Sequence, residues 1–165
     1  MKSAIIFLLI SITSLYCKSL TSIGGFEIGM PIKQVEYLIN ASNNCLLKFT
    51  YDQDIYVKQQ KFNLYTGTHY FADGLKHKYT FMFVKGVLYS LMRETTDLSS
   101  TNSDMYELFL RMEELVIAET GQRSNTSYGN IRAWSFPDTN TEWSITYDNS
   151  AKPHVIVEHL IYLQQ

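Results

Sequence analysis

Alternating apolar positions between residues 79 and 92 predict a β-hairpin at the centre of the chain. Two apolar runs flank Lys85-Gly86, and glycine tolerates the positive φ that a two-residue hairpin turn requires. This turn predicts that Phe81 pairs with Ser90 on the facing strand. One face of the hairpin would then carry five large side chains and would need a cover: Tyr79, Phe81, Phe83, Leu88 and Met92.

Helical spacing of apolar residues predicts two helices. The longer pattern covers residues 103–120, and Gly121 follows where a C-terminal cap belongs. Its apolar stripe consists of Met105, Leu108, Phe109, Met112, Leu115 and Val116. The earlier pattern begins after Pro31, which suits a first helical turn. Its stripe consists of Ile32, Val35, Leu38 and Ile39.

Between the first helix and the central hairpin, shorter patterns predict two strands. Residues 46–51 predict a strand, Asp52-Gln53-Asp54 predicts a turn, and residues 55–64 predict a polar edge strand. Residues 65–74, with two glycines, are typical of a loop. This part of the chain therefore supplies one short strand and one long strand to the predicted sheet.

After the second helix, residues 122–130 are polar and predict a flexible segment. Residues 131–136 and 142–147 predict a second hairpin, with Trp134 and Phe136 on one face and Trp143, Ile145 and Tyr147 on the partner's face. Residues 155–163 predict a last strand that closes the sheet, with Val155, Val157 and Ile161 sharing a face. A helix followed by strands thus occurs twice. We therefore predict an α+β fold in which two helices pack on one face of a single antiparallel sheet.

The first residues have the composition of a targeting segment. Lys2 precedes an apolar run over residues 4–15, which is too short to span a membrane and typical of a signal peptide. We assign residues 1–19 to the signal peptide and residues 20–165 to one α+β domain. Two processing routes stay open, namely cleavage after Ser19 and lipidation at Cys17.

Charge and cysteine content narrow the possible partners. The chain has 14 basic and 16 acidic residues. Removal of Lys2 and Lys18 with the signal peptide leaves 12 basic and 16 acidic residues, which argues against nucleic acid or anionic lipid as a partner. Cys45 becomes the one remaining cysteine, so an intrachain disulfide is excluded.

Motifs for catalysis or metal binding are absent from the sequence. It has no glycine-rich phosphate loop, no serine elbow and no paired-cysteine or histidine zinc spacing. Cys45 is the candidate nucleophile of the mature chain, although no histidine adjoins it in sequence. His154 and His159 would point to opposite faces of a strand, whereas His69 and His77 could approach each other without a third ligand. We therefore predict no catalytic, cofactor-binding or metal-binding residue.

Two acidic pairs and a set of aromatic residues are the remaining candidates for a functional site. Asp52 and Asp54 resemble the start of a calcium loop, but the required glycine and glutamate are missing. Glu113 and Glu114 are interpreted as the solvated face of a helix. Aromatic residues in predicted turns, edges and loops are suited to anchoring a partner protein: Tyr51, Tyr56, Tyr65, Tyr70, Phe71 and Tyr128.

The segment Ile28-Gly29-Met30-Pro31-Ile32-Lys33-Gln34-Val35 resembles a motif of small bacterial envelope proteins, in which a strand ending in Gly-Met leads directly into a helix. The chain is similar in this respect to outer-membrane-assembly lipoproteins and to β-lactamase-inhibitor-like domains. The resemblance implies a helix-plus-antiparallel-sheet fold and a binding or scaffolding role in the envelope. The chain departs from these families in having one helix, not two, in its first half, and in lacking the cysteines for the inhibitor type's disulfides.

These observations lead to three hypotheses of function. The first is an exported, periplasmic or secreted non-enzymatic protein that binds another protein as an inhibitor, immunity factor or envelope accessory. The second is a small exported enzyme that uses Cys45 or a histidine. The third is a lipoprotein anchored through Cys17.

Overall fold

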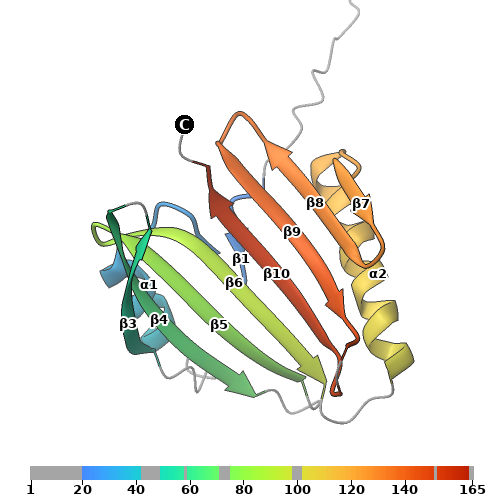
Figure 1. Cartoon of the computed structure of the whole chain (residues 1–165), viewed down its shortest axis with the longest axis horizontal. Coiled ribbons are helices and arrows are strands. Elements are labelled where there is room, and N and C mark those ends of the chain that lie inside the picture. Colours follow the sequence, from blue (N-terminus) through green and yellow to red (C-terminus); the bar gives the residue numbers. More distant parts are fainter. Residues whose placement is uncertain are drawn as a thin grey trace, which may run out of the picture.

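The computed structural model describes residues 20–41, 49–57, 59–70, 75–97, 102–150 and 152–163 (Figure 1). Within these residues the chain forms an α+β fold with two helices, an eight-stranded antiparallel sheet and a separate two-stranded sheet. The predicted fold class is confirmed at this level. The two-stranded sheet was not predicted, so the expectation of a single sheet is wrong. Residues 1–19 and Cys45 lie outside the described residues, and the signal peptide stays a prediction.

The large sheet contains two groups of four consecutive strands. Its strands, in spatial order, are β3 (Thr50–Val57), β4 (Gln60–Tyr70), β5 (Leu75–Val84), β6 (Val87–Asp97), β10 (Val155–Tyr162), β9 (Thr141–Asp148), β8 (Ile131–Phe136) and β7 (Thr126–Tyr128). The helices are α1 (Ile32–Ala41) and α2 (Asn102–Thr120), and the small sheet pairs β1 (Ser22–Ile23) with β2 (Phe26–Glu27). A helix precedes each group of four strands, as the sequence predicts.

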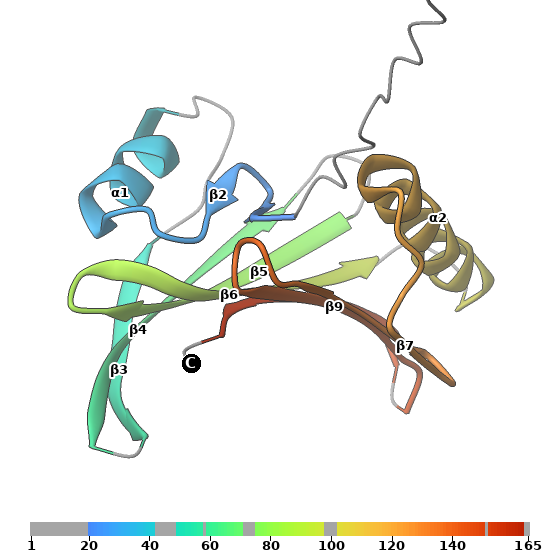
Figure 2. The same cartoon turned by 90° about the horizontal axis from the view of Figure 1, so that it is seen from above.

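Both helices and the small sheet lie on the same face of the large sheet (Figure 2). The β1–β2 hairpin lies between α1 and α2 and covers the middle of this face. Its turn approaches the sheet closely, because a Cβ atom at Gly24 would lie 2.7 Å from the hydroxyl oxygen of Tyr79. Gly24 also has φ +59°, a backbone conformation that residues with a Cβ atom disfavour.

The two groups of strands join through β6 and β10, where Leu91 lies opposite Leu160. The last strand therefore lies at the centre of the sheet and does not close it at an edge. Its buried side chains are Ile156, Glu158 and Leu160. Val155, Val157 and Ile161 share a face, as expected, but this face points away from the helices.

The central hairpin forms with the predicted turn but with a shifted register. A β-bulge inserts Tyr89 between the residues that pair with Phe83 and Met82, so Phe81 pairs with Leu91 and not with Ser90. Because one extra residue moves all later side chains to the other face, Leu91 is buried in the core and Met92 faces away from the helices. The expected position of Met92 is therefore wrong, while the other four members of the face are confirmed.

The strands before the central hairpin differ from the prediction. β3 continues through residues 52–54, where a turn was expected, and the chain reverses between Val57 and Gln60, with Gln59 at φ +68°. β4 extends to Tyr70 across the predicted loop. Because β4 pairs with β3 on one side and β5 on the other, these contacts outweigh its local preference for a loop. A short strand, β7, likewise forms inside the polar segment 122–130.

Helix α2 confirms the longer helical pattern, with one exception. Met105, Phe109 and Val116 are buried, and the N–H of Gly121 bonds to the carbonyl of Ile117 at 2.8 Å. Leu115 was expected in the stripe but is 67% exposed. Leu115 lies about 100° around the helix axis from Val116, so its side chain points away from the buried side of the helix.

Candidate functional site

The two faces of the large sheet have different surroundings, because side chains alternate between them along every strand. The helix side carries the hydrophobic core, including Phe81, Trp134 and Trp143. No helix or strand among the described residues covers the opposite surface, which we call the open face (Figure 2). The strands at both ends of the sheet bend away from the helices in this view, so the open face is the concave side of the sheet.

The open face mixes aliphatic, sulfur-containing and hydroxyl side chains. The register places these apolar residues on it, from six strands: Ile55, Phe62, Leu64, Met82, Met92, Val157, Ile161 and Ile131. Hydroxyl side chains lie between them, among them Thr66, Thr80, Ser144 and Thr146. Lys78 and Glu94 add charge at one end and form an ion pair of 3.3 Å.

Aromatic rings connect the open face to the end of the sheet. The ring of Phe62 lies 5.4 Å from that of Tyr89, in an edge-on arrangement, and the ring of Tyr89 lies 6.2 Å from that of Tyr162. The β-bulge places Tyr89 and Ser90 consecutively between Leu88 and Leu91, which both enter the core. The bulge therefore turns Ser90 to the open face beside Tyr89, whereas in a regular strand Ser90 would point inward like Leu88.

A serine and a histidine are hydrogen-bonded near the middle of the open face. Oγ of Ser90 and Nε2 of His159 lie 2.8 Å apart, on the neighbouring strands β6 and β10. Burial lowers the pKa of His159 from its ordinary value of 6.5, and the nearby carboxylate of Glu142 partly opposes this shift. The imidazole is therefore held neutral at a pH at which an exposed histidine would begin to take up a proton.

The Ser90–His159 pair has the composition of a nucleophile and its base, but its geometry favours a structural role. Ser90 is 2% exposed, so a substrate has almost no access to its hydroxyl. No hydrogen bond joins Glu142 to His159 in the part of the chain that the structure describes. The pair satisfies two polar groups in a mainly apolar surface, which is what burial requires of them.

On the helix side, an ion pair is buried at the junction of the two groups of strands. Nε of Arg93 donates a hydrogen bond to Oε2 of Glu158, and Glu158 is 4% exposed. Burial raises the pKa of Glu158 in spite of the positive charge of Arg93. Burial alone would lower the pKa of Arg93, but the charge and hydrogen bond of Glu158, helped by Tyr79, raise it. Sequence analysis missed this pair, because Glu158 lies in a strand whose apolar alternation predicts the wrong inward face.

The four histidines considered from the sequence lie on or next to strands β4, β5 and β10. His69 and His77 are direct cross-strand partners on β4 and β5. The sequence placed them on either side of a predicted loop, but β4 extends to Tyr70 and the two residues pair within the sheet. His154 bonds through Nδ1 to the hydroxyl of Tyr147, while His159 bonds to Ser90 on the open face. Among the described residues, no group of three or more potential metal ligands comes together.

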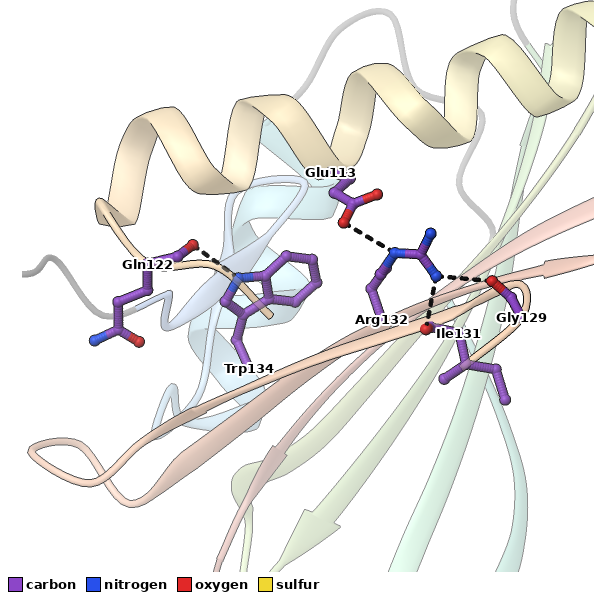
Figure 3. Close-up of polar contacts among 6 residues, drawn as sticks. All are labelled: Glu113, Gln122, Gly129, Ile131, Arg132 and Trp134. Carbon is purple, nitrogen blue, oxygen red and sulfur yellow. Dashed lines mark hydrogen bonds and ion pairs between the residues drawn. The ribbon is translucent and has the colours of Figure 1, made fainter. Parts of the chain in front are cut away.

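The acidic residues considered from the sequence are engaged in structural contacts. Asp54 lies within β3, accepts a hydrogen bond from Asn63 at 2.7 Å and pairs with Lys61. Glu113 accepts a hydrogen bond of 2.9 Å from Nε of Arg132, whose guanidinium also donates to the carbonyls of Gly129 and Ile131 (Figure 3). The interpretation of Glu113 as a solvated residue is therefore wrong, because it joins α2 to Arg132 on β8, whereas Glu114 is exposed as expected.

Three of the tyrosines expected at edges are exposed there. Tyr51 and Tyr56 lie on the edge strand β3, and Tyr128 lies on the edge strand β7 at the opposite end of the sheet. Tyr65 differs, because its ring stacks on that of Phe49 and packs against the core. The side chain of Tyr70, together with Phe71, Cys17 and Cys45, lies outside the described residues. The exposed tyrosines frame the open face at its two edges.

Comparisons with protein-family models, curated proteins and solved structures gave no significant match for this chain. Its function is therefore inferred from the geometry of the sheet and from the sequence. None of the helices in the described part of the chain has the length and apolar character needed to cross a membrane.

Proposed function

We propose that this chain is an exported, non-enzymatic protein that binds a partner protein on the open face of its large sheet. The observation that carries the proposal is the contrast between the faces, since apolar residues from six strands lie on a side that no described helix covers. Phe62 and Leu64 are buried within this face, whereas the other apolar residues on it are partly or fully exposed. An exposed apolar patch often marks an interaction site. The signal-peptide composition of residues 1–19 supports export, and the acidic balance of the mature chain supports a protein partner.

The proposed partner is a folded protein that presents a convex surface. A concave sheet is complementary in shape to such a surface, and interfaces of stable complexes are well packed at their centres. Tyr89 supplies a large ring near one end of the open face, where it contacts the ring of Phe62, which is itself 6% exposed. Tyrosines are frequent among the residues that dominate binding energy, which makes Tyr89 the expected anchor.

Site-specific photocrosslinking in the producing cells tests this proposal. A photoreactive residue at Thr80 lies in the middle of the open face, whereas one at Tyr37 lies on α1, where the native side chain is 70% exposed. We expect a defined protein adduct from position 80 and none from position 37. Ile161→Lys should abolish the adduct, whereas the matched charge Leu115→Lys on the outer side of α2 should leave it unchanged. Equal adducts from both positions, or no adduct from position 80, would contradict binding on this face.

Export is tested separately by the mass of the mature protein. Cleavage after Ser19 predicts a chain that begins at Leu20, while lipidation predicts an acylated chain that begins at Cys17. A mature protein that retains residues 1–19 would overturn export without affecting the crosslinking result.

A hydrolytic enzyme is the second candidate function, favoured by the contact of Ser90 with His159. A fluorophosphonate probe distinguishes the two candidates, because it labels a serine that a neighbouring base activates. Labelling that disappears in Ser90→Ala would support the enzyme. Unlabelled wild-type protein would leave the binding function as the better explanation.

A further inference from the structure

A pocket of about 330 Å³ lies at the end of the large sheet, beside the segment that resembles the envelope-protein motif. Its walls come from five separate parts of the chain: Thr21 before β1, the loop that follows β2, the β5–β6 turn with the start of β6, the β8–β9 turn and the end of β10. Pockets of this size are within the range that binds small molecules.

One wall of the pocket is fixed by backbone hydrogen bonds to the start of β6. The N–H of Gly29 bonds to the carbonyl of Leu88 at 2.9 Å, and the N–H of Leu88 bonds to the carbonyl of Met30 at 2.8 Å. A further bond of 2.9 Å runs from the N–H of Ile32 to the carbonyl of Gly86. The loop before α1 thus lies along the sheet in a defined position, which fixes this wall of the pocket.

The opposite wall is fixed in the same way. The N–H of Leu163 bonds to the carbonyl of Asn140 at 2.6 Å, which holds the end of β10 against the β8–β9 turn. The hydroxyls of Thr139 and Thr141 bond to each other at 2.7 Å, and Thr141 also reaches the carbonyl of Leu20. The polar groups of this wall are largely satisfied within the protein.

Gly29, in the lining of the pocket, has a backbone conformation that favours glycine. Its φ is +93°, which other residues rarely adopt, and no heavy atom lies within 4 Å of the position that a Cβ would take. A side chain here would be strained and would project into unoccupied space. The glycine of the sequence motif therefore has a local structural purpose, which is to turn the chain beside the pocket.

The lining of the pocket is apolar and carries no charge. Ile28, Val84 and Val87 supply aliphatic surface, and Tyr89 and Tyr162 supply aromatic rings. The hydroxyls of these two tyrosines make no hydrogen bond to the residues that the structure describes. A tyrosine hydroxyl both donates and accepts, so two such groups are available to a bound molecule.

We propose that this pocket binds a small, uncharged aromatic molecule that carries a hydrogen-bonding group. An apolar cavity of about 150 Å³ holds benzene, so a pocket about twice as large suits two fused rings. A charged ligand is disfavoured, because its ionic group would lose water without meeting an opposite charge. This inference concerns a different ligand from the partner protein proposed above, although Tyr89 belongs both to the pocket and to the proposed anchor.

A second hollow in the sheet supplies an internal control. It has a volume of about 420 Å³ and lies at the β7 edge, where Tyr128, Ile131 and Asp148 contribute to its lining. It is shallower and more open to water than the first pocket, with the strongly exposed ring of Tyr128 and the carboxylate of Asp148 in its lining. It should therefore not select uncharged aromatic molecules.

The test uses 2-naphthol as the probe and 2-naphthoate as its charged counterpart, titrated into the ¹⁵N-labelled full chain. We expect 2-naphthol to shift the amide resonances of Gly29, Val87 and Tyr162, and 2-naphthoate to bind at least about tenfold more weakly. Equal affinity for the two probes would overturn the proposal. So would shifts confined to the hollow around Ile131.

Two pocket variants and one control variant test whether the pocket is the binding site. Val87 is 43% exposed, so Val87→Trp places a large ring at the pocket with little risk to folding, and it should weaken 2-naphthol binding at least about tenfold. Ile131→Trp adds the same ring at the other hollow and should leave the affinity unchanged. Tyr162→Phe removes one hydroxyl and should weaken binding several-fold while the fold is retained. Unchanged affinity in both Val87→Trp and Tyr162→Phe would contradict the assignment.

Discussion

The two faces of the large sheet are built from the same strands but carry different chemistry. On the helix side, Phe81, Trp134, Trp143 and their neighbours form a closed core with rings in edge-on and tilted contacts. On the open face, threonines and serines separate the aliphatic side chains, and the one fully enclosed hydroxyl bonds to a histidine. The helix side is complete without a partner, whereas the open face presents apolar groups to solvent.

This difference separates the residues that stabilise the fold from those available for binding. Substitutions on the helix side should lower the free energy of unfolding strongly, because they open cavities or leave a buried charge without its partner. Substitutions on the open face should leave the fold intact and act on binding. Three experiments test how sharp this division is.

The largest effect is expected at the buried ion pair on the helix side. Glu158→Ala leaves the guanidinium of Arg93 buried without its partner, which should lower the free energy of unfolding by about 3–5 kcal/mol in chemical denaturation. The double variant Arg93→Met/Glu158→Leu removes both charges and should be markedly more stable than the single variant. Lys78→Met, in the exposed pair with Glu94 on the open face, should cost at most about 1 kcal/mol. A similar loss in Glu158→Ala and Lys78→Met would show that the two faces do not differ in this way.

A pair of adjacent residues tests the division most directly. Leu91 is fully buried on the helix side and Met92 points to the open face, so Leu91→Ala should cost about 2–5 kcal/mol and Met92→Ala about 1 kcal/mol or less. Urea denaturation of both variants measures the difference. A larger loss for Met92→Ala would mean that the bulge at Tyr89 is absent and that the regular hairpin register is the true one.

The smallest effect concerns the response of the open face to pH. Because burial lowers the pKa of His159, the unfolded chain takes up a proton at His159 more readily than the folded chain does. Its contribution to stability is complete above the ordinary pKa of 6.5 and decreases as the pH falls through and below that value. Denaturation at about pH 7.5 and 5.5 should show a smaller loss on acidification for His159→Gln than for the wild type. The lowered pKa values of Asp54 and Asp148 act in a more acidic range and do not interfere.

Much of the helix side was predictable from the sequence, because packing there follows simple periodicity. The stripes of both helices and the inward faces of β8 and β9 are confirmed at Val35, Phe109, Trp134 and Ile145. The failures have local causes. A single inserted residue at Tyr89 reversed the later part of β6, and pairing on both sides made β4 a strand where its own sequence favours a loop.

The candidate site was harder to predict, because it depends on which strands are neighbours. The Ser90–His159 contact joins residues 69 positions apart, and it exists only because β10 lies beside β6. The alternation of Val155, Val157 and Ile161 was visible in the sequence, but an amphipathic strand does not state which face is buried. Glu158 lies between Ile156 and Leu160, which both face inward. Once the inward face of β10 is known, the carboxylate of Glu158 must also be buried and needs a partner such as Arg93.

The position of β10 has a consequence for biosynthesis. It is the last of the eight strands in chain order, yet it lies between β6 and β9. While the polypeptide emerges from the ribosome or a translocation channel, the first four strands therefore have a vacant hydrogen-bonding edge on β6 until residues 155–162 are released. A nascent or prematurely truncated molecule would expose that edge to aggregation, so the native assembly depends on the completion of its final strand.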